Sequence, residues 1–74
     1  MEERVKQIIA EIIGIEFECI DEQTSPDNVP DWDSLKHMQI IIALEEEFSV
    51  EIPDEYIEKM LGVDKIFSVL RSLI

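Results

Sequence analysis

The amino-acid sequence predicts an all-α fold, a small four-helix bundle with three longer helices, a short third helix and a long first loop. Residues 2–13, 34–48 and 64–74 repeat apolar side chains every three or four positions and contain no Gly or Pro, which is typical of amphipathic helices. Only residues 15–19 alternate as a strand would, and no second alternating run of comparable length exists to pair with them. Because 74 residues, 46% of them hydrophobic, support one modest core, we expect a single free-standing domain over residues 1–74, although a module excised from a larger enzyme would look similar.

The first helix is expected over Glu2 to Ile13. Glu2 and Glu3 favour the positive end of the helix dipole, and Gly14 can take the left-handed conformation that ends a helix. The apolar face has i, i+3 and i+4 spacing and consists of Val5, Ile8, Ile9, Ile12 and Ile13.

Residues 15–30 are predicted to form a long ordered connection. Turn-forming residues fill its second half, namely Asp21, Thr24, Ser25, Pro26, Asp27, Asn28 and Pro30. We expect this connection to pack over the helices through Phe17, Ile20, Val29 and Trp32, with Cys19 as a small apolar loop residue. A connection of this length is unusual in a small domain and favours a functional role.

The second helix is the centre of the prediction. Pro30 biases Val29 away from helical geometry, and Asp33 and Ser34 are both common N-cap types, so the helix should begin at one of these two residues. Its core-facing arc spans roughly 100° on a helical wheel and contains Ile40, Ile41, Leu44 and Phe48.

The same helix carries a second apolar strip on the side expected to face water. Leu35 and Ile42 lie roughly 160 to 180° from Leu44 on the wheel, and Met38 lies between the two faces. A wide core face could accommodate all three residues. Apolar residues clustered within a charged rim more often mark a surface to which a partner binds.

The segment after the second helix is predicted to contain a short link and a short helix. Val50 and Ile52 can point inward from the link. Asp54 can cap a helix that runs through Leu61 and stops at Gly62. This helix has only about two turns of apolar face and should depend on its neighbours.

Asp64 can cap the final helix, in which Lys65 and Arg71 are expected to remain in water. The residues expected to pack inward are Ile66, Phe67, Val69, Leu70, Leu73 and Ile74.

The charge of the chain restricts its partners. Eighteen acidic and six basic residues leave a net charge of -12, which argues against nucleic acid and anionic membranes and favours basic protein surfaces. From His37 to Glu58 there are seven acidic residues and no Lys or Arg. Part of this charge keeps a small domain soluble, but solubility does not explain why the acids surround the surplus apolar strip.

Several kinds of site and location are disfavoured by the sequence. A single cysteine excludes an internal disulfide and a cysteine metal site. The acids after Asp31 lack the central Gly of a calcium-binding loop, so we expect no specific metal site. The N-terminus has no basic region followed by a long apolar run, and no segment approaches membrane-spanning length, so we expect a soluble cytoplasmic monomer.

Ser34 is the candidate functional residue. A helix start favours anions, so a phosphate ester on its hydroxyl would be electrostatically favourable, although a serine at this place is usually only a cap. His37 lies one turn later, but a Ser-His pair on an exposed helix lacks the oxyanion hole and pocket of a hydrolase. We therefore expect no catalysis and treat His37 as an ordinary helix residue.

Asp33-Ser34-Leu35, followed by an apolar helix ending Ala43-Leu44-Glu45-Glu46-Glu47-Phe48 and then by Val50-Glu51-Ile52-Pro53-Asp54-Glu55, resembles the acyl carrier proteins, and the resemblance covers essentially the whole chain. It implies that Ser34 accepts 4'-phosphopantetheine from coenzyme A, catalysed by a separate phosphopantetheinyl transferase, with Asp33 and Leu35 completing the motif. The thiol of the arm then carries an acyl group as a thioester.

The resemblance also implies that the second helix binds acyl-loading and acyl-processing enzymes through their basic docking surfaces. A cleft near Ile52 and Tyr56 could sequester the acyl chain. The family implies a role in fatty-acid, polyketide or other specialised biosynthesis. Lys36 stands where many members have an acidic or small residue, and Gln39 replaces a common acid, which indicates a dedicated carrier in a specialised pathway. An aminoacyl or peptidyl carrier and an unmodified acidic interaction subunit remain alternatives. The expected partner-binding residues are Leu35, Lys36, Met38, Gln39, Ile42, Glu45, Glu46, Ile52, Asp54 and Glu55.

Overall fold

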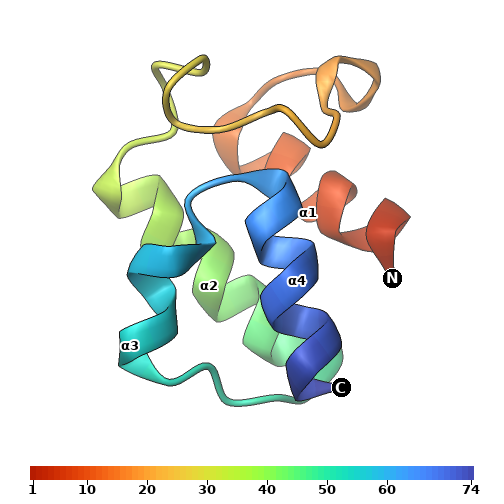
Figure 1. The fold of residues 1–74 in the computed structure, drawn as a ribbon. Coiled ribbons are helices and arrows are strands. Elements are labelled where there is room, and N and C mark those ends of the chain that lie inside the picture. The colour runs from red at the N-terminus through yellow and green to blue at the C-terminus, as the bar shows by residue number, and fades with distance from the viewer.

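The computed structural model covers residues 1–74 and contains helices and turns but no strand (Figure 1). This confirms the all-helical prediction. The α-helices are α1 (Glu2–Ile13), α2 (Ser34–Phe48), α3 (Asp54–Ile57) and α4 (Val63–Leu73), and the 3-10 turns are η1 (Phe17–Cys19) and η2 (Glu58–Met60).

Helix α1 has the predicted bounds, and its end is fixed by glycine. Gly14 has φ 85° and ψ 35°, and its N–H donates to the carbonyl of Ala10. This left-handed residue ends the helix. Glycine suits the position because residues that have a Cβ reach that conformation only at a cost. Of the predicted apolar face, Ile12 is only partly buried, whereas the other four residues are buried.

The connection between α1 and α2 crosses one end of the helices, drawn from orange to yellow in Figure 1. Ile20 and Trp32 are buried as predicted, and Thr24 accepts the N–H of Val63 through its carbonyl, which ties the connection to the start of α4. The prediction that Phe17 is an anchor was wrong, because the local hydrogen bonds of η1 turn Phe17 and Cys19 outward and leave Ile20 facing the core.

The two predicted caps in the last third of the chain were wrong. Pro53, not Asp54, is the N-cap residue of α3, and the expected single short helix is divided into α3 and η2. Helix α4 begins at Val63, with Asp64 already inside its first turn. Gly62 precedes it with φ 156° and ψ 154°, a conformation that is essentially restricted to glycine, so the cap and the helix start both lie two residues earlier than predicted.

One hydrophobic core joins the long helices, the connection and η2. The prediction that Ile74 packs inward was wrong, because it lies beyond the last turn of α4 and is 61% exposed. None of the helices combines the length and apolar character needed to cross a bilayer. The fully or almost fully buried apolar residues are Val5, Ile8, Ile9, Ile13, Ile20, Trp32, Ile40, Ile41, Leu44, Ile52, Met60, Val63, Ile66, Phe67 and Leu70.

Candidate functional site

The start of α2 presents Ser34 at the surface. Asp33 is the N-cap residue, and its Oδ1 accepts the N–H of Lys36 at 2.8 Å. Ser34 is the first helical residue and is exposed. Because Asp33 makes the capping hydrogen bond, the hydroxyl of Ser34 is not needed as the cap. Capping therefore does not explain why a serine stands at position 34, and its hydroxyl is accessible.

A hollow of about 560 Å³ lies beside Ser34, between the start of α2, the end of the connection, and the α3–η2 segment. Leu61 forms part of its wall and is 41% exposed, although sequence reasoning assigned it only as the end of a helix. The full lining is Pro26, Trp32, Asp33, Ser34, His37, Met38, Ile57, Glu58 and Leu61.

Two hydrogen bonds of His37, one buried and one partly buried, lie along one side of this hollow. The indole N–H of Trp32 donates to Nδ1 of His37 at 3.0 Å, and Nε2 of His37 lies 2.9 Å from the carbonyl oxygen of Ile57. Trp32 and His37 are only 3% and 5% exposed. The prediction that His37 is an ordinary helix residue was therefore wrong, because His37 links the connection to α3. A helical wheel could not reveal this role, since neither partner lies on α2.

The apolar strip predicted on α2 is exposed in the structure. Leu35, Met38 and Ile42 are 67%, 42% and 51% exposed, so they do not form a wide core face. Ser34, Met38 and Ile42 are spaced four residues apart and therefore follow one line along the helix. The strip begins at the candidate attachment residue and continues toward the acidic end of α2.

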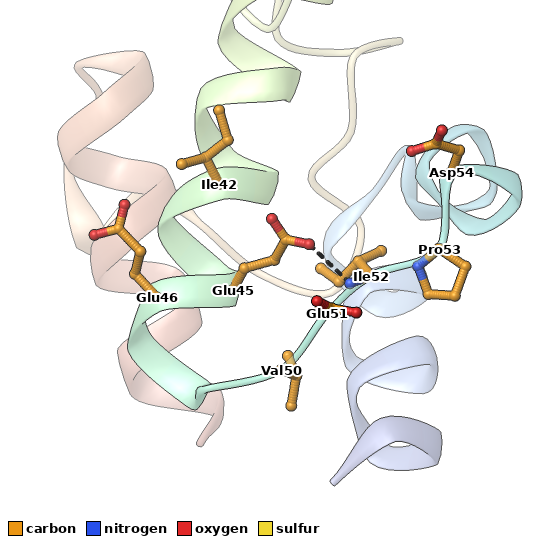
Figure 2. Close-up of a pocket in the computed structure, with 8 residues that line it drawn as sticks. All are labelled: Ile42, Glu45, Glu46, Val50, Glu51, Ile52, Pro53 and Asp54. Carbon is orange, nitrogen blue, oxygen red and sulfur yellow. Dashed lines mark hydrogen bonds between the residues drawn. The ribbon is translucent and has the colours of Figure 1, made fainter.

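A second hollow of about 720 Å³ lies at that acidic end, between α2 and the segment that leads into α3 (Figure 2). Glu45 accepts the backbone N–H of Ile52 at 2.8 Å, shown as the dashed line in Figure 2. Ile52 is only 5% exposed and contributes to the core as well as to this hollow. Two predicted partner residues, Glu45 and Ile52, thus hold the link in place, and Ile42, Glu46 and Asp54 complete the rim around them.

The remaining predicted partner residues differ in availability. Gln39, Glu46, Asp54 and Glu55 are exposed. Lys36 is only partly exposed, and its ammonium donates to the backbone carbonyl of Ile12 at 3.1 Å. The positive charge of Lys36 is therefore already paired with the carboxyl end of α1, and the exposed charges around the strip are mostly negative.

No cluster of three or more His, Cys, Asp or Glu side chains is arranged to hold a metal ion. No family model matches the chain. The functional interpretation therefore depends on the exposed serine, the two hollows and the acidic apolar face.

Proposed function

We propose that the protein is an acyl carrier whose Ser34 is modified with 4'-phosphopantetheine. The observation that supports this most is the position of Ser34, a surface residue at the first turn of α2 with an exposed apolar strip leading away from it. We also propose that the four α-helices form the four-helix bundle of the carrier proteins, and that the protein acts in the cytoplasm.

The start of α2 fits a phosphate ester. The N–H groups of Lys36 and His37 are paired with Asp33, through its side chain and its carbonyl respectively. The N–H groups of Ser34 and Leu35 belong to the first turn and have no partner within the helix. Together with the positive end of the helix dipole, these two donors favour an anion on the hydroxyl of Ser34.

The arm, when attached, supplies a thiol on which an acyl group is held as a thioester. The chain itself contributes display and recognition. Leu35, Met38 and Ile42 offer an apolar contact surface. The hollow beside Ser34 and the second hollow, at the acidic end of α2, flank this surface on the α3 side. This arrangement allows a partner enzyme to bind α2 while it acts on a group carried at Ser34.

The acidic residues favour partners with basic surfaces. Glu46, Asp54 and Glu55 are exposed around the second hollow or beside it. Exposed ion pairs steer the encounter and set orientation more than they raise affinity, which suits a carrier that must leave one enzyme for the next. We infer that acyl-loading and acyl-processing enzymes bind this face.

Intact-mass spectrometry tests the proposal. We expect incubation with coenzyme A, magnesium and a broad-specificity phosphopantetheinyl transferase to add one arm to the protein. Ser34→Ala should receive none, whereas Ser68→Ala, which removes another exposed hydroxyl, should be modified like the wild type. An unmodified wild-type protein under conditions that modify a known carrier would refute the assignment.

An unmodified acidic interaction subunit is the second candidate, because the exposed strip and its acids would serve that role without an arm. A hydrolase has less support, since both ring nitrogens of His37 are hydrogen-bonded to groups other than Ser34. Absence of the arm combined with retained binding to basic partners would favour the subunit. An aminoacyl or peptidyl carrier would show the arm but a different cargo.

A further inference from the structure

Three segments around the Ser34 hollow are joined through one histidine. Trp32 lies in the connection, His37 in α2 and Ile57 at the end of α3. The hydrogen bonds of His37 to Trp32 and to Ile57 are 3.0 and 2.9 Å long, and the Trp32 and His37 rings lie with centroids 6.0 Å apart. All three residues also line the hollow.

These partners determine which ring nitrogen carries the proton. An indole N–H can only donate a hydrogen bond, so Nδ1 of His37 must accept it. A carbonyl oxygen can only accept, so Nε2 must carry the single proton of the neutral ring and donate it to Ile57. A second proton would have to reside on Nδ1, where it would face the indole N–H of Trp32. Protonation is therefore incompatible with the bond to Trp32.

We propose that His37 is a proton-sensitive positioning residue, whose neutral ring holds Trp32 and α3 together and thereby sets the shape of the hollow beside Ser34. Protonation breaks the bond to Trp32 and releases the connection that leads into Ser34. The bonds themselves stand independently of the proposed function, but the consequence for loading of Ser34 rests on it.

The charged side chains nearest to the His37 ring within the hollow are carboxylates. The carboxylates of Asp33, from the end of the connection, and Glu58, from η2, line the same hollow and would attract an imidazolium. The cations of the neighbouring segments are directed elsewhere, Lys36 toward the end of α1 and Lys59 over the ring of Tyr56. A proton on His37 thus gains negative neighbours and loses one hydrogen bond. Histidine is also the side chain that ordinarily changes its charge between about pH 5 and pH 8.

NMR of the isotope-labelled full chain tests, without any ligand, whether protonation of His37 breaks its hydrogen bond to Trp32. The protein has one tryptophan and one histidine, so a single indole N–H signal reports on this pair. We expect that signal to shift upfield and to lose its protection from solvent exchange as the pH falls from about 7.5 to about 5.5, a range in which unperturbed carboxylates stay mostly ionised. His37→Gln, which offers amide donors and an acceptor but no titrating nitrogen, should show no such transition.

Two outcomes would overturn the proposed role of His37. One is an indole signal that does not change with pH in the wild-type protein, and the other is an equal change in His37→Gln. The wild-type protein and His37→Gln are each followed through their own indole signal. A loss of stability in either protein is therefore recognised from the rest of its spectrum.

The loading assay then tests the consequence at Ser34. Between the same two pH values, transferase turnover on the wild-type carrier should fall roughly tenfold relative to His37→Gln, as expected when one orienting hydrogen bond is lost. Measuring both carriers with one enzyme preparation cancels the pH dependence of the transferase itself. An unchanged ratio would refute the role in loading, whereas failure to load either carrier at any pH would refute the proposed function and leave the NMR result intact.

Discussion

The ammonium of Lys36 lies 3.1 Å from the backbone carbonyl oxygen of Ile12 and so connects the first turn of α2 to the last turn of α1. The last carbonyls of a helix lack partners within the helix and form the negative end of its dipole. Helix α1 has no basic residue in its own last turn, so Lys36 supplies the missing cation from elsewhere in the chain.

Replacing Lys36 should therefore reduce stability. We expect Lys36→Met to lower the free energy of unfolding by about 1 kcal/mol, the sum of a lost hydrogen bond and a lost dipole contact. Lys65→Met is the matched control, because it removes the same charge from an exposed position. Urea denaturation of the two variants measures the difference, and equal losses would show that net charge alone is responsible.

Truncation should reduce stability strongly at Ile41 and hardly at all at its neighbour Ile42. Ile41 is 2% exposed and Ile42 is 51% exposed. We expect Ile41→Ala to cost about 2 to 5 kcal/mol through lost burial and a residual cavity. Ile42→Ala should change stability by less than about 0.5 kcal/mol and weaken partner binding instead. A large destabilisation by Ile42→Ala in denaturant titration would mean that the strip belongs to the core.

The end of α2 contains backbone strain that glycine should relieve. Ser49 is the C-cap residue with φ 54° and ψ 47°, and it is the only residue other than glycine with positive φ. We expect Ser49→Gly to raise the free energy of unfolding by about 0.5 to 1 kcal/mol. Ser68→Gly, in the interior of α4, should lower it by about 0.5 kcal/mol. Thermal unfolding followed by circular dichroism distinguishes the two signs.

Glu45 should matter for stability more than its neighbour Glu46. Its carboxylate accepts the N–H of Ile52, whereas Glu46 is exposed on the rim of the same hollow. We expect Glu45→Ala to cost about 1 to 2 kcal/mol because the bond to a charged acceptor is lost. Glu45→Gln should recover part of that loss through its amide oxygen, and Glu46→Ala should be nearly neutral. Equal effects of the two alanine variants in urea titration would contradict the structural role of Glu45.

The net charge of -12 should make stability depend on salt. Repulsion among the carboxylates favours the expanded chain, and ions screen it over about 10 Å at 0.1 M ionic strength. We expect the melting temperature to rise by several degrees, about 4 to 8 °C for each kcal/mol gained in a domain of this size. Sodium chloride and magnesium chloride at equal ionic strength should act alike, and a clearly larger effect of magnesium would indicate bound ions. A flat melting temperature would show that self-repulsion is unimportant.

Much of the fold could be predicted because its causes are local. The spacing of apolar residues and Gly14 gave the bounds of α1, and the residues around Asp33 gave the start of α2. The exposure of Leu35, Met38 and Ile42 followed from a wheel that already had a complete core face. The errors at Asp54 and Asp64 arose where Pro53 and Gly62 set the helix starts through backbone geometry, which side-chain capping preferences do not describe.

The sequence by itself determined that this protein is helical, acidic and supplied with a serine at the start of a helix that has two apolar faces. The helices and the place of the serine depend on residues within a turn or two of one another, and the charge depends on composition alone. Only the tertiary structure decided that His37 joins Trp32 to Ile57, that Lys36 closes α1 and that Glu45 holds Ile52. Those contacts link residues 5 to 24 positions apart, often from different elements. Their geometry depends on how the elements pack, which no local pattern contains.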